Sequence, residues 1–366
     1  MNKRKLTAAL SILLALSLTA CHSGTSETGA FSEVSENSSG LTPFTIGHLP
    51  ATGHILFFIG YEEGFFADEG LDVTLKQFDN NTAELAALEA GKIDVAPINA
   101  TNLINFVSEG HKLTSIGGVM SDGHALVVNK SVVEGVDPKD YSLELLKGKT
   151  IVLQAGSTYD VEFRMALKEA GLDLENDLNI VSADSGTSAY NALNNGEIAG
   201  AAVYAPFRQK AIDAGFIPLL YCDEIEYFED PICCRSVTLE ENVSADPDKY
   251  EAYTRAMIRA AEFLEQNHAK SIEDAGKYLD IDAELLEKDT YNHSINNPDP
   301  DEAKTVTFYN AMKELGYLDG KADINISDYV NNDIYENALD KLSESNPDNY
   351  YKKLLEYHEN AVAQTS

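Results

Sequence analysis

Tryptophan is absent from this chain of 366 residues, cysteine occurs four times, and 27 lysines and arginines stand against 60 aspartates and glutamates. The formal net charge of −33 at pH 7 excludes nucleic acid as a plausible partner, because a phosphate backbone is bound through basic side chains. Besides Cys21 the cysteines are Cys222, Cys233 and Cys234. An odd number cannot pair completely, so we exclude a disulfide-stabilised scaffold.

Catalytic signatures are also missing. The sequence contains no G-x-S-x-G, no H-E-x-x-H and no phosphate-binding loop, which are the patterns that place a nucleophile, a metal ion or a nucleotide. Asp280, Asp282, Asp299 and Asp301 lack the glycine and final glutamate of a calcium loop. We therefore predict a binding protein, not an enzyme, that has no cofactor and no metal site.

The N-terminus has the pattern of an export signal. Lys3, Arg4 and Lys5 precede an uncharged apolar run over residues 6–18, which is shorter than the about 20 residues of a membrane-spanning helix. The run ends in Leu-Thr-Ala-Cys21, which resembles the lipobox of bacterial lipoproteins. We predict a signal peptide over 1–20, lipidation of Cys21, and a flexible tether over 21–42, which is rich in Ser, Thr, Gly and Glu. This pattern predicts a lipid-anchored protein on the extracytoplasmic face of the cell membrane.

An internal repeat predicts the architecture. Residues 79–96 recur 105 positions later as residues 184–201, with Asp, Thr, Ala-Leu, Gly, Ile and Ala in register. In each copy a short apolar strand is followed by a helix, a second strand, a second helix and a third strand, an order that favours an α/β lobe with a mostly parallel sheet. The predicted strands are 44–47, 71–75 and 93–96 in one copy, and 150–153, 178–181 and 198–203 in the other.

Two such lobes are predicted, with a helical C-terminal extension. The first lobe covers 43–128, the second covers 129–228, and 229–366 returns to the first lobe before the C-terminal helices. Amphipathic patterns predict helices at 250–266, 271–278, 301–315 and 349–361, which Pro298, Pro300 and Pro347 separate.

The repeat also predicts where a ligand binds, because ligands of open parallel sheets lie beyond the carboxyl ends of the strands. Equivalent loops follow the first strands at 48–54 and 154–159, and a second pair follows the third strands at 97–101 and 203–206. Both first loops lead into helix N-termini, which suit an anionic or acceptor-rich ligand. The candidate ligand-binding residues are His48, Thr52, His54, Asn99, Thr101, His124, Ser157, Thr158, Tyr159, Tyr204 and Arg235.

Several short stretches give the chain a resemblance to a known family. Residues 60–66 with 69–73, 88–96, 146–151 and 192–202 are similar to the nitrate, sulfonate, taurine and thiamine-precursor binding proteins of ABC importers. The resemblance implies the two-lobed periplasmic-binding-protein fold (type II, Venus flytrap), with lobes hinged over a small-molecule ligand. It also implies a membrane permease with a cytoplasmic ATPase as partner, and we expect a monomer. Many relatives carry an acidic residue where this chain has Ala205, so the ligand specificity of those relatives cannot be assigned to this chain from that position.

The ligand remains open at this point. A small organic anion such as a sulfonate suits helix N-termini and Arg235, whereas a thiamine-precursor pyrimidine suits the tyrosines and histidines. Another alternative is a pyrimidine-precursor synthase, an enzyme class with this fold and a cysteine-rich motif that Cys233-Cys234 faintly resembles. A zinc receptor that uses His48, His54 and His124 is another.

Overall fold

The computed structural model describes residues 40–228, 231–346 and 349–364. The predicted signal peptide, Cys21 and most of the predicted tether lie outside these residues. Eleven strands are assigned within the described ranges. They are β1 Thr42–His48, β2 Leu71–Gln77, β3 Ala96–Asn99, β4 Leu113–Asp122, β5 His124–Val128, β6 Thr150–Val152, β7 Asn179–Val181, β8 Gly200–Tyr204, β9 Ile217–Tyr221, β10 Ile232–Leu239 and β11 Ser294–Ile295.

The strands of the first lobe form two hydrogen-bonded groups. β1 and β2 pair in parallel, and a parallel bridge between Ile46 and Val95 joins β1 to the start of β3. A four-stranded sheet has the order β11-β4-β10-β3, and its neighbours are antiparallel. The parallel pair agrees with the repeat, but the antiparallel strands arise from the segments that connect the lobes.

The second lobe contains a five-stranded sheet in the order β7-β6-β8-β5-β9. β6 pairs in parallel with both β7 and β8, as the repeat predicts. β5 and β9 add antiparallel pairs. The two-lobed α/β fold is therefore confirmed, and both lobes have mixed sheets because the strands near the crossings run against the repeated ones.

The chain passes between the sheets at two places. β4 belongs to the first sheet and β5 to the second, so the first crossing occurs at Gly123, whose φ of 90° is accessible to glycine. β5 lies inside the predicted first-lobe segment 43–128, so this crossing comes earlier than that predicted boundary. The return takes place between β9 and β10, before Ile232, where β10 begins.

Fourteen α-helices are assigned within the described ranges. They are α1 Ile55–Glu62, α2 Phe65–Asp68, α3 Asn81–Glu89, α4 Ala100–Ser108, α5 Thr158–Glu169, α6 Gly186–Asn194, α7 Phe207–Asp213, α8 Glu240–Ala245, α9 Pro247–Gln266, α10 His268–Ala275, α11 Ala283–Tyr291, α12 Glu302–Glu314, α13 Asn332–Ser345 and α14 Asn349–Ala363. Short 3₁₀ turns are η1 Thr52–His54, η2 Lys130–Val132, η3 Pro138–Asp140, η4 Leu143–Leu146, η5 Cys222–Glu224 and η6 Ile326–Tyr329. The four predicted C-terminal helices are present, and α8, α11 and α13 are additional helices of the segment 229–366.

The helix caps of the two lobes follow the internal repeat. Asn80 caps α3 by accepting the N–H of Ala83 at 2.9 Å, and Ser185 caps α6 by accepting the N–H of Ser188 at 3.1 Å. The two caps are equivalent in the repeat, 105 positions apart. Both residues have the extended backbone that a cap requires.

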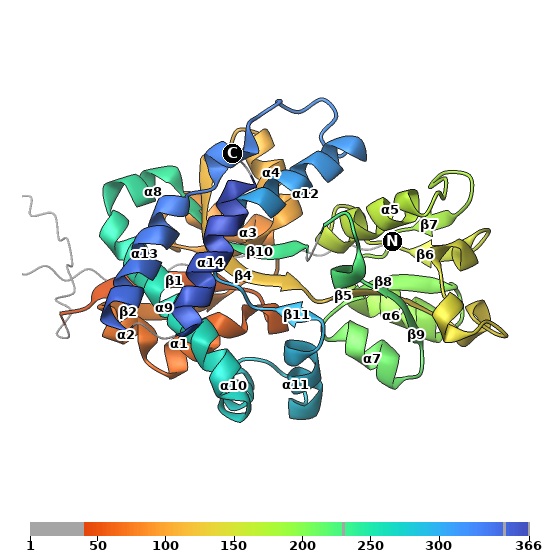
Figure 1. Cartoon of the computed structure of the whole chain (residues 1–366), viewed down its shortest axis with the longest axis horizontal. Helices are drawn as coiled ribbons and strands as arrows, with labels where there is room; N and C mark the ends of the chain where they lie inside the picture. The colour runs from red at the N-terminus through yellow and green to blue at the C-terminus, as the bar shows by residue number, and fades with distance from the viewer. Residues whose placement is uncertain (1–39, 229–230, 347–348, 365–366) are drawn as a thin grey trace, which may run out of the picture. The chain divides into compact units, whose positions relative to one another are not determined.

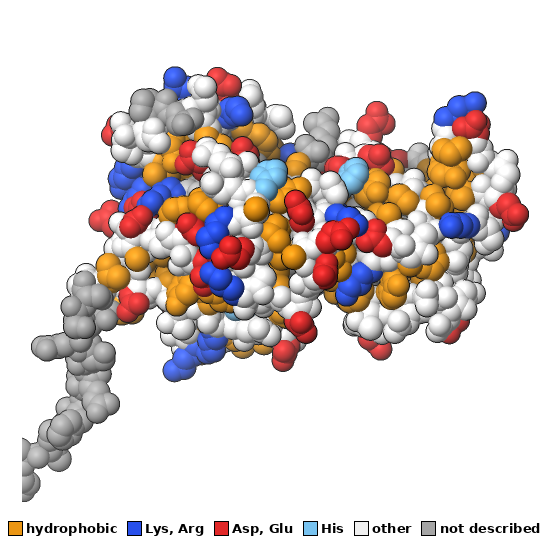
Figure 2. All heavy atoms as spheres, turned by 90° about the horizontal axis from the view of Figure 1, so that it is seen from below, with side chains coloured by type: hydrophobic (Ala, Val, Ile, Leu, Met, Phe, Trp, Pro, Cys, Tyr) orange, Lys and Arg blue, Asp and Glu red, His pale blue; other side chains and the backbone are white. Residues whose placement is uncertain are grey.

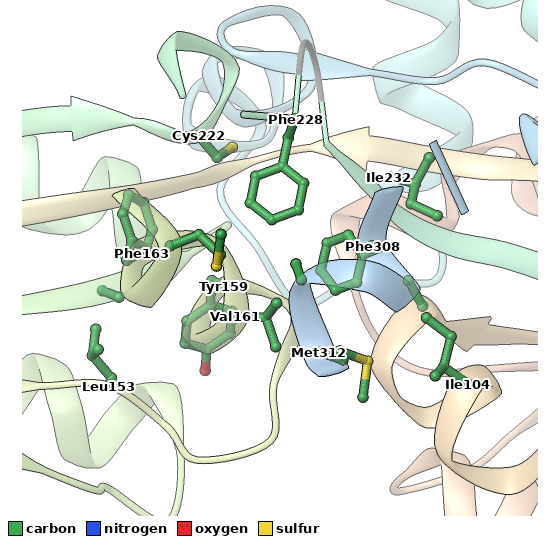
Figure 3. Close-up of a cluster of buried hydrophobic side chains, with 14 of the residues drawn as sticks. Ile104, Leu153, Tyr159, Val161, Phe163, Cys222, Phe228, Ile232, Phe308 and Met312 are labelled. Atoms are coloured by element: carbon green, nitrogen blue, oxygen red, sulfur yellow. The ribbon is translucent and has the colours of Figure 1, made fainter. Parts of the chain in front are cut away.

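The C-terminal helices cover the first lobe. α9 packs against α1 and α13, and α13 contacts α14; Figure 1 shows this group on the side of the first lobe. α12 is different because it also contacts α5 of the second lobe. Phe308 and Met312 of α12 are buried in a core that includes Ile104 and Val161, one from each lobe (Figure 3).

The charged surface is mixed in sign. On the face drawn in Figure 2, lysine and arginine side chains lie among aspartates and glutamates. Ion pairs also join separate elements: Lys168–Glu314 at 2.7 Å links α5 to α12. In the described part of the chain, no helix is long and apolar enough to cross a membrane.

Candidate functional site

The ends of two strands, one from each lobe, meet at the crossing strands. Cys234 of β10 pairs with Asn99 at the end of β3, and His124 of β5 pairs with Tyr204 at the end of β8. The Cys233 sulfur lies 3.9 Å from His124 Nε2 and 3.6 Å from the Cys234 sulfur. The carboxyl ends of β3 and β8 are therefore connected through three adjacent side chains, in the region where the repeat predicts a ligand.

Three predicted residues form an aromatic wall on the second-lobe side. The ring centroid of Tyr159 is 5.2 Å from that of His124 and 5.6 Å from that of Tyr204. The Tyr159 hydroxyl donates to Gln154 Oε1 at 2.6 Å. Gln154 directly follows the strand region in the predicted loop, and it holds the Tyr159 ring in place. The Tyr159 ring is tilted by 47° against His124 and by 33° against Tyr204, and the three rings form an aromatic cluster suited to an apolar or aromatic part of a ligand.

Ser157 and Thr158 stand at the N-terminus of α5. Ser157 is the cap of this helix, since its Oγ accepts the N–H of Asp160 at 3.2 Å. Thr158 is 3% exposed, and its Oγ1 is buried with no hydrogen-bond partner within the described residues. An unpaired buried hydroxyl is costly. A ligand or water at this helix end would remove that cost.

The first-lobe side is organised around Asn81, which is not among the predicted ligand-binding residues. Its Oδ1 accepts the N–H of Asn99 at 3.2 Å and the Nδ2 of Asn102 at 3.0 Å. Its Nδ2 donates to Glu84 at 2.6 Å. Asn99 in turn caps α4 and accepts from the Thr101 hydroxyl at 2.9 Å. The predicted residues Asn99 and Thr101 thus belong to one hydrogen-bonded network at the end of β3.

His48, Thr52 and His54 lie inward from that edge, and each is at most 5% exposed. The N–H of Leu49 donates to His54 Nδ1 at 3.0 Å, and η1 packs against β4 and α11. A methyl group at Gly53 would lie 2.3 Å from the Met120 sulfur, so η1 is closely apposed to β4. His48 and His54 therefore lie close to each other and are packed within the first lobe. They do not form a metal site with His124 in the described residues.

Arg235, a predicted ligand-binding residue, lies in the protein interior. It is fully buried, and its guanidinium donates to the carbonyls of Cys234, Met120 and Asp299 and to the Ser121 hydroxyl, at 2.8–3.2 Å. These partners belong to β10, β4 and the segment before α12. In this structure Arg235 ties the crossing strands to the C-terminal region and is engaged by protein groups, not oriented toward a ligand.

Two carboxylates that the sequence did not single out are buried at the site. Glu84 is completely buried below Asn81, and Glu162 of α5 accepts from His124 Nδ1 at 2.8 Å. Burial opposes a charge on His124, but the Glu162 carboxylate outweighs it and raises the pKa of His124 to about 10. Glu84 and Glu162 lie one helical turn into α3 and α5, next to the predicted loops. This position is the feature of the sequence from which their place at the site could have been predicted.

Glu84 should make stability depend on pH. Burial raises the pKa of Glu84 to about 7, against the opposing effects of His54 and Asn81. A raised carboxyl pKa contributes stability below its unfolded value of about 4.3, and this stability is lost as pH rises through the folded value. Relative to Glu84→Gln, we expect the wild type to lose about 2–3 kcal/mol of unfolding free energy between pH 5 and 8. Urea titrations of both proteins at several pH values measure this; parallel pH profiles would contradict it.

Comparisons with known proteins agree with this geometry. A protein-family model described as the NMT1-like family matches residues 37–276. A binding protein of Brucella abortus is 25% identical over 237 residues, which are 64% of this chain and 70% of that protein. Among solved structures, the periplasmic nitrate-binding protein of Synechocystis has a TM-score of 0.68 at 16% identity, covering 82% of this chain and 89% of that one. The periplasmic aliphatic sulphonate-binding protein of Escherichia coli has a TM-score of 0.65 at 17% identity, with coverages of 75% and 92%.

Proposed function

Because the chain belongs to the NMT1-like family, we propose that it is the solute-binding component of an ABC importer and holds a small organic anion, such as a sulfonate, between its lobes. The observation that carries this proposal is the meeting of the β3 and β8 ends at Cys233, Cys234 and His124. Ligands of this architecture bind where strand ends from two sheets converge. Binding without chemistry accords with this arrangement, in which His124 is already paired with Glu162.

The anion class is favoured by the groups at the α5 end of the site. A helix N-terminus presents N–H groups and a partial positive charge, and Ser157 and Thr158 add hydroxyls there. The apolar part of an alkanesulfonate would contact Tyr159 and Tyr204. The acidic net charge of −33 slows approach of an anion at low salt, so the association rate should rise as salt screens this field.

A heteroaromatic ligand, such as a thiamine-precursor pyrimidine, is the second candidate. The contact of the Tyr159 ring with both His124 and Tyr204 favours it, because aromatic rings stack well on such a surface. This ligand needs no charge complement from α5. The two candidates therefore differ in how strongly they depend on the hydroxyls of Ser157 and Thr158.

The remaining parts of the proposal concern the membrane and the hinge. Cys21 carries the lipid that keeps a monomeric protein on the extracytoplasmic face, and the partner is a permease with its ATPase. The lobes move about the crossings at Gly123 and before Ile232. A ligand that contacts both lobes has a higher affinity for the closed form, and that difference drives closure.

The double variant Ser157→Ala/Thr158→Ala tests the site. Loss of two hydroxyls at the α5 N-terminus should cost about 1–3 kcal/mol of binding free energy, which is roughly a five- to hundredfold weaker affinity for an alkanesulfonate. Isothermal titration of a series of alkanesulfonates and pyrimidines against wild type and variant measures the difference. Thermal melting of both proteins accounts for the lost helix cap, which is worth about 1 kcal/mol.

Ser131→Ala/Ser142→Ala is the matched control, because both serines are exposed and lie in or beside the η2 and η4 turns. It should bind like the wild type. Full affinity in the Ser157/Thr158 variant would place the site elsewhere. No binding of any sulfonate, together with tight binding of a pyrimidine, would select the second candidate.

A further inference from the structure

A compact group of potential metal ligands lies beside the first crossing. It consists of His124 on β5, Glu162 on α5 and Cys222, the first residue of η5. One ligand atom from each lies within 4.8 Å of the other two, and in the described part of the chain no other group of three or more His, Cys, Asp and Glu side chains meets this condition. All three are nearly or completely buried, with at most 3% exposure. They come from three separate segments, so the fold alone assembles them.

The hydrogen bonds of this group leave one carboxylate oxygen free to bind a cation. His124 Nδ1 contacts Glu162 Oε2 at 2.8 Å, and the backbone N–H of His124 donates to the Cys222 sulfur at 3.2 Å. Glu162 Oε1, in contrast, is buried and has no hydrogen-bond partner within the described residues. A buried carboxylate oxygen without a partner is expensive. A cation bound to it would satisfy it.

The set of donor atoms indicates the kind of cation. One imidazole nitrogen, one thiolate sulfur and one carboxylate oxygen form the mixed N, S and O set that suits Zn²⁺, which binds such atoms at about 2.0–2.3 Å with tetrahedral geometry. Tetrahedral ligands at these lengths are about 3.2–3.8 Å apart, which is within the 4.8 Å that bounds the distances between the three ligand atoms. Asp122 Oδ1 lies 4.0 Å from the Cys222 sulfur but is not part of this group, so a water molecule would complete a tetrahedral shell.

We propose that His124, Glu162 and Cys222 form a binding site for a zinc-type divalent cation, with a water molecule in the fourth position. On binding, the Cys222 thiol and the His124 Nδ1 each release a proton to solvent, so the cation is held by a thiolate, a neutral imidazole and a carboxylate. His124 Nε2 keeps its contact with the Cys233 sulfur, which orients the ring as an outer partner does in zinc sites.

The position of the site gives the cation a structural role. Asp122 and His124 flank Gly123, where the chain crosses to the second lobe, and Cys222 begins the segment that returns to the first lobe. A bound cation therefore joins the start of both crossings to α5. The site shares His124 with the proposed solute site, but its other two ligands, Glu162 and Cys222, are completely buried and are not among the predicted ligand-binding residues. The inference does not depend on the proposed function.

Cobalt provides a direct test, because a thiolate bound to Co²⁺ gives a charge-transfer absorption band and four-coordinate Co²⁺ gives intense visible bands. The full chain is freed of metal with a chelator and titrated with Co²⁺, both as the native protein and during refolding. We expect one equivalent to produce both bands and one equivalent of Zn²⁺ to abolish them. Cys222→Ser should lose the charge-transfer band, and Glu162→Gln should bind Co²⁺ at least about tenfold more weakly.

Two controls separate this site from other thiols and histidines. Cys233→Ser removes a sulfur that touches His124 but is not in the group, and His111→Gln alters an exposed His–Glu pair; both should keep the bands. If Cys222→Ser does not fold, X-ray absorption of the zinc-loaded wild type decides, with one sulfur ligand expected. Absence of the bands in the wild type under both loading protocols, their persistence in folded Cys222→Ser, or an all-oxygen-and-nitrogen zinc shell would overturn the proposal in favour of a metal-free His124–Glu162 ion pair.

Discussion

Replacing Arg235 by methionine is expected to lower the free energy of unfolding by about 3–5 kcal/mol. The guanidinium is completely buried and makes four hydrogen bonds, three of them to backbone carbonyls. Methionine has a similar length but no donor, so the carbonyls of Cys234, Met120 and Asp299 would stay buried without a partner. Because these carbonyls come from β10, β4 and the segment before α12, the loss also loosens the crossings between the lobes.

Urea denaturation of the wild type and of Arg235→Met measures this effect. Arg259→Met is the matched control, because Arg259 is 24% exposed and pairs with Asp68 and Glu69 near the surface, where ion pairs contribute about 0–1 kcal/mol. A loss below about 1 kcal/mol in Arg235→Met would show that its hydrogen bonds are not needed to hold the crossings.

Phe308→Ala is expected to lower the free energy of unfolding by a comparable amount, about 3–5 kcal/mol. Phe308 is completely buried in α12, and its ring centroid lies 5.1 Å from that of Phe228, in the segment that returns from the second lobe. Figure 3 shows Phe308 within the same cluster as Met312, Ile104 and Val161. Alanine would leave a cavity between elements of both lobes, and the close-packed surroundings could collapse into it only partly.

Phe308→Leu and Val181→Ala provide the comparison. Leucine keeps most of the side-chain volume, so its cost should be clearly smaller. Val181 is 36% exposed, and its truncation should change stability by less than about 0.5 kcal/mol. If Phe308→Ala melts like the wild type, α12 is not part of the core that joins the lobes.

The two substitutions also have a consequence for the proposed binding function. Arg235 holds the strands at the crossings and Phe308 packs where α12 meets α5, whereas Ser157 and Thr158 lie at the N-terminus of α5. A variant of Arg235 or Phe308 should change both the free energy of unfolding and the ease of lobe closure. A variant of Ser157 or Thr158 should change ligand affinity with little change in stability. Measuring ligand affinity and stability for each variant distinguishes residues that hold the lobes together from residues that contact the ligand.

Local pattern was enough to predict much of this protein. The apolar strands and the amphipathic helices depend on neighbours within a few residues, and the repeat shows that their order recurs 105 positions later. The structure confirms two α/β lobes with parallel strand pairs where the repeat placed them. Gly91 and Gly196 close their helices with φ of 61° and 74°, as left-handed C-terminal residues do. The same local logic placed Tyr159, Tyr204, Asn99 and His124 at strand or helix ends, where they are found.

Only the tertiary structure decided which buried polar groups meet. The partners of Arg235 lie up to 115 positions away in the chain, and the antiparallel strands that mix the sheets pair across similar separations. No local pattern distinguishes a guanidinium bound to carbonyls from one facing a ligand, because the two differ only in what distant segments bring beside it. For the same reason the burial of His54, the inward turn of Asn81 and the grouping of His124, Glu162 and Cys222 follow from packing. The sequence sets the elements and their ends, and the packing of distant segments against one another sets the contacts.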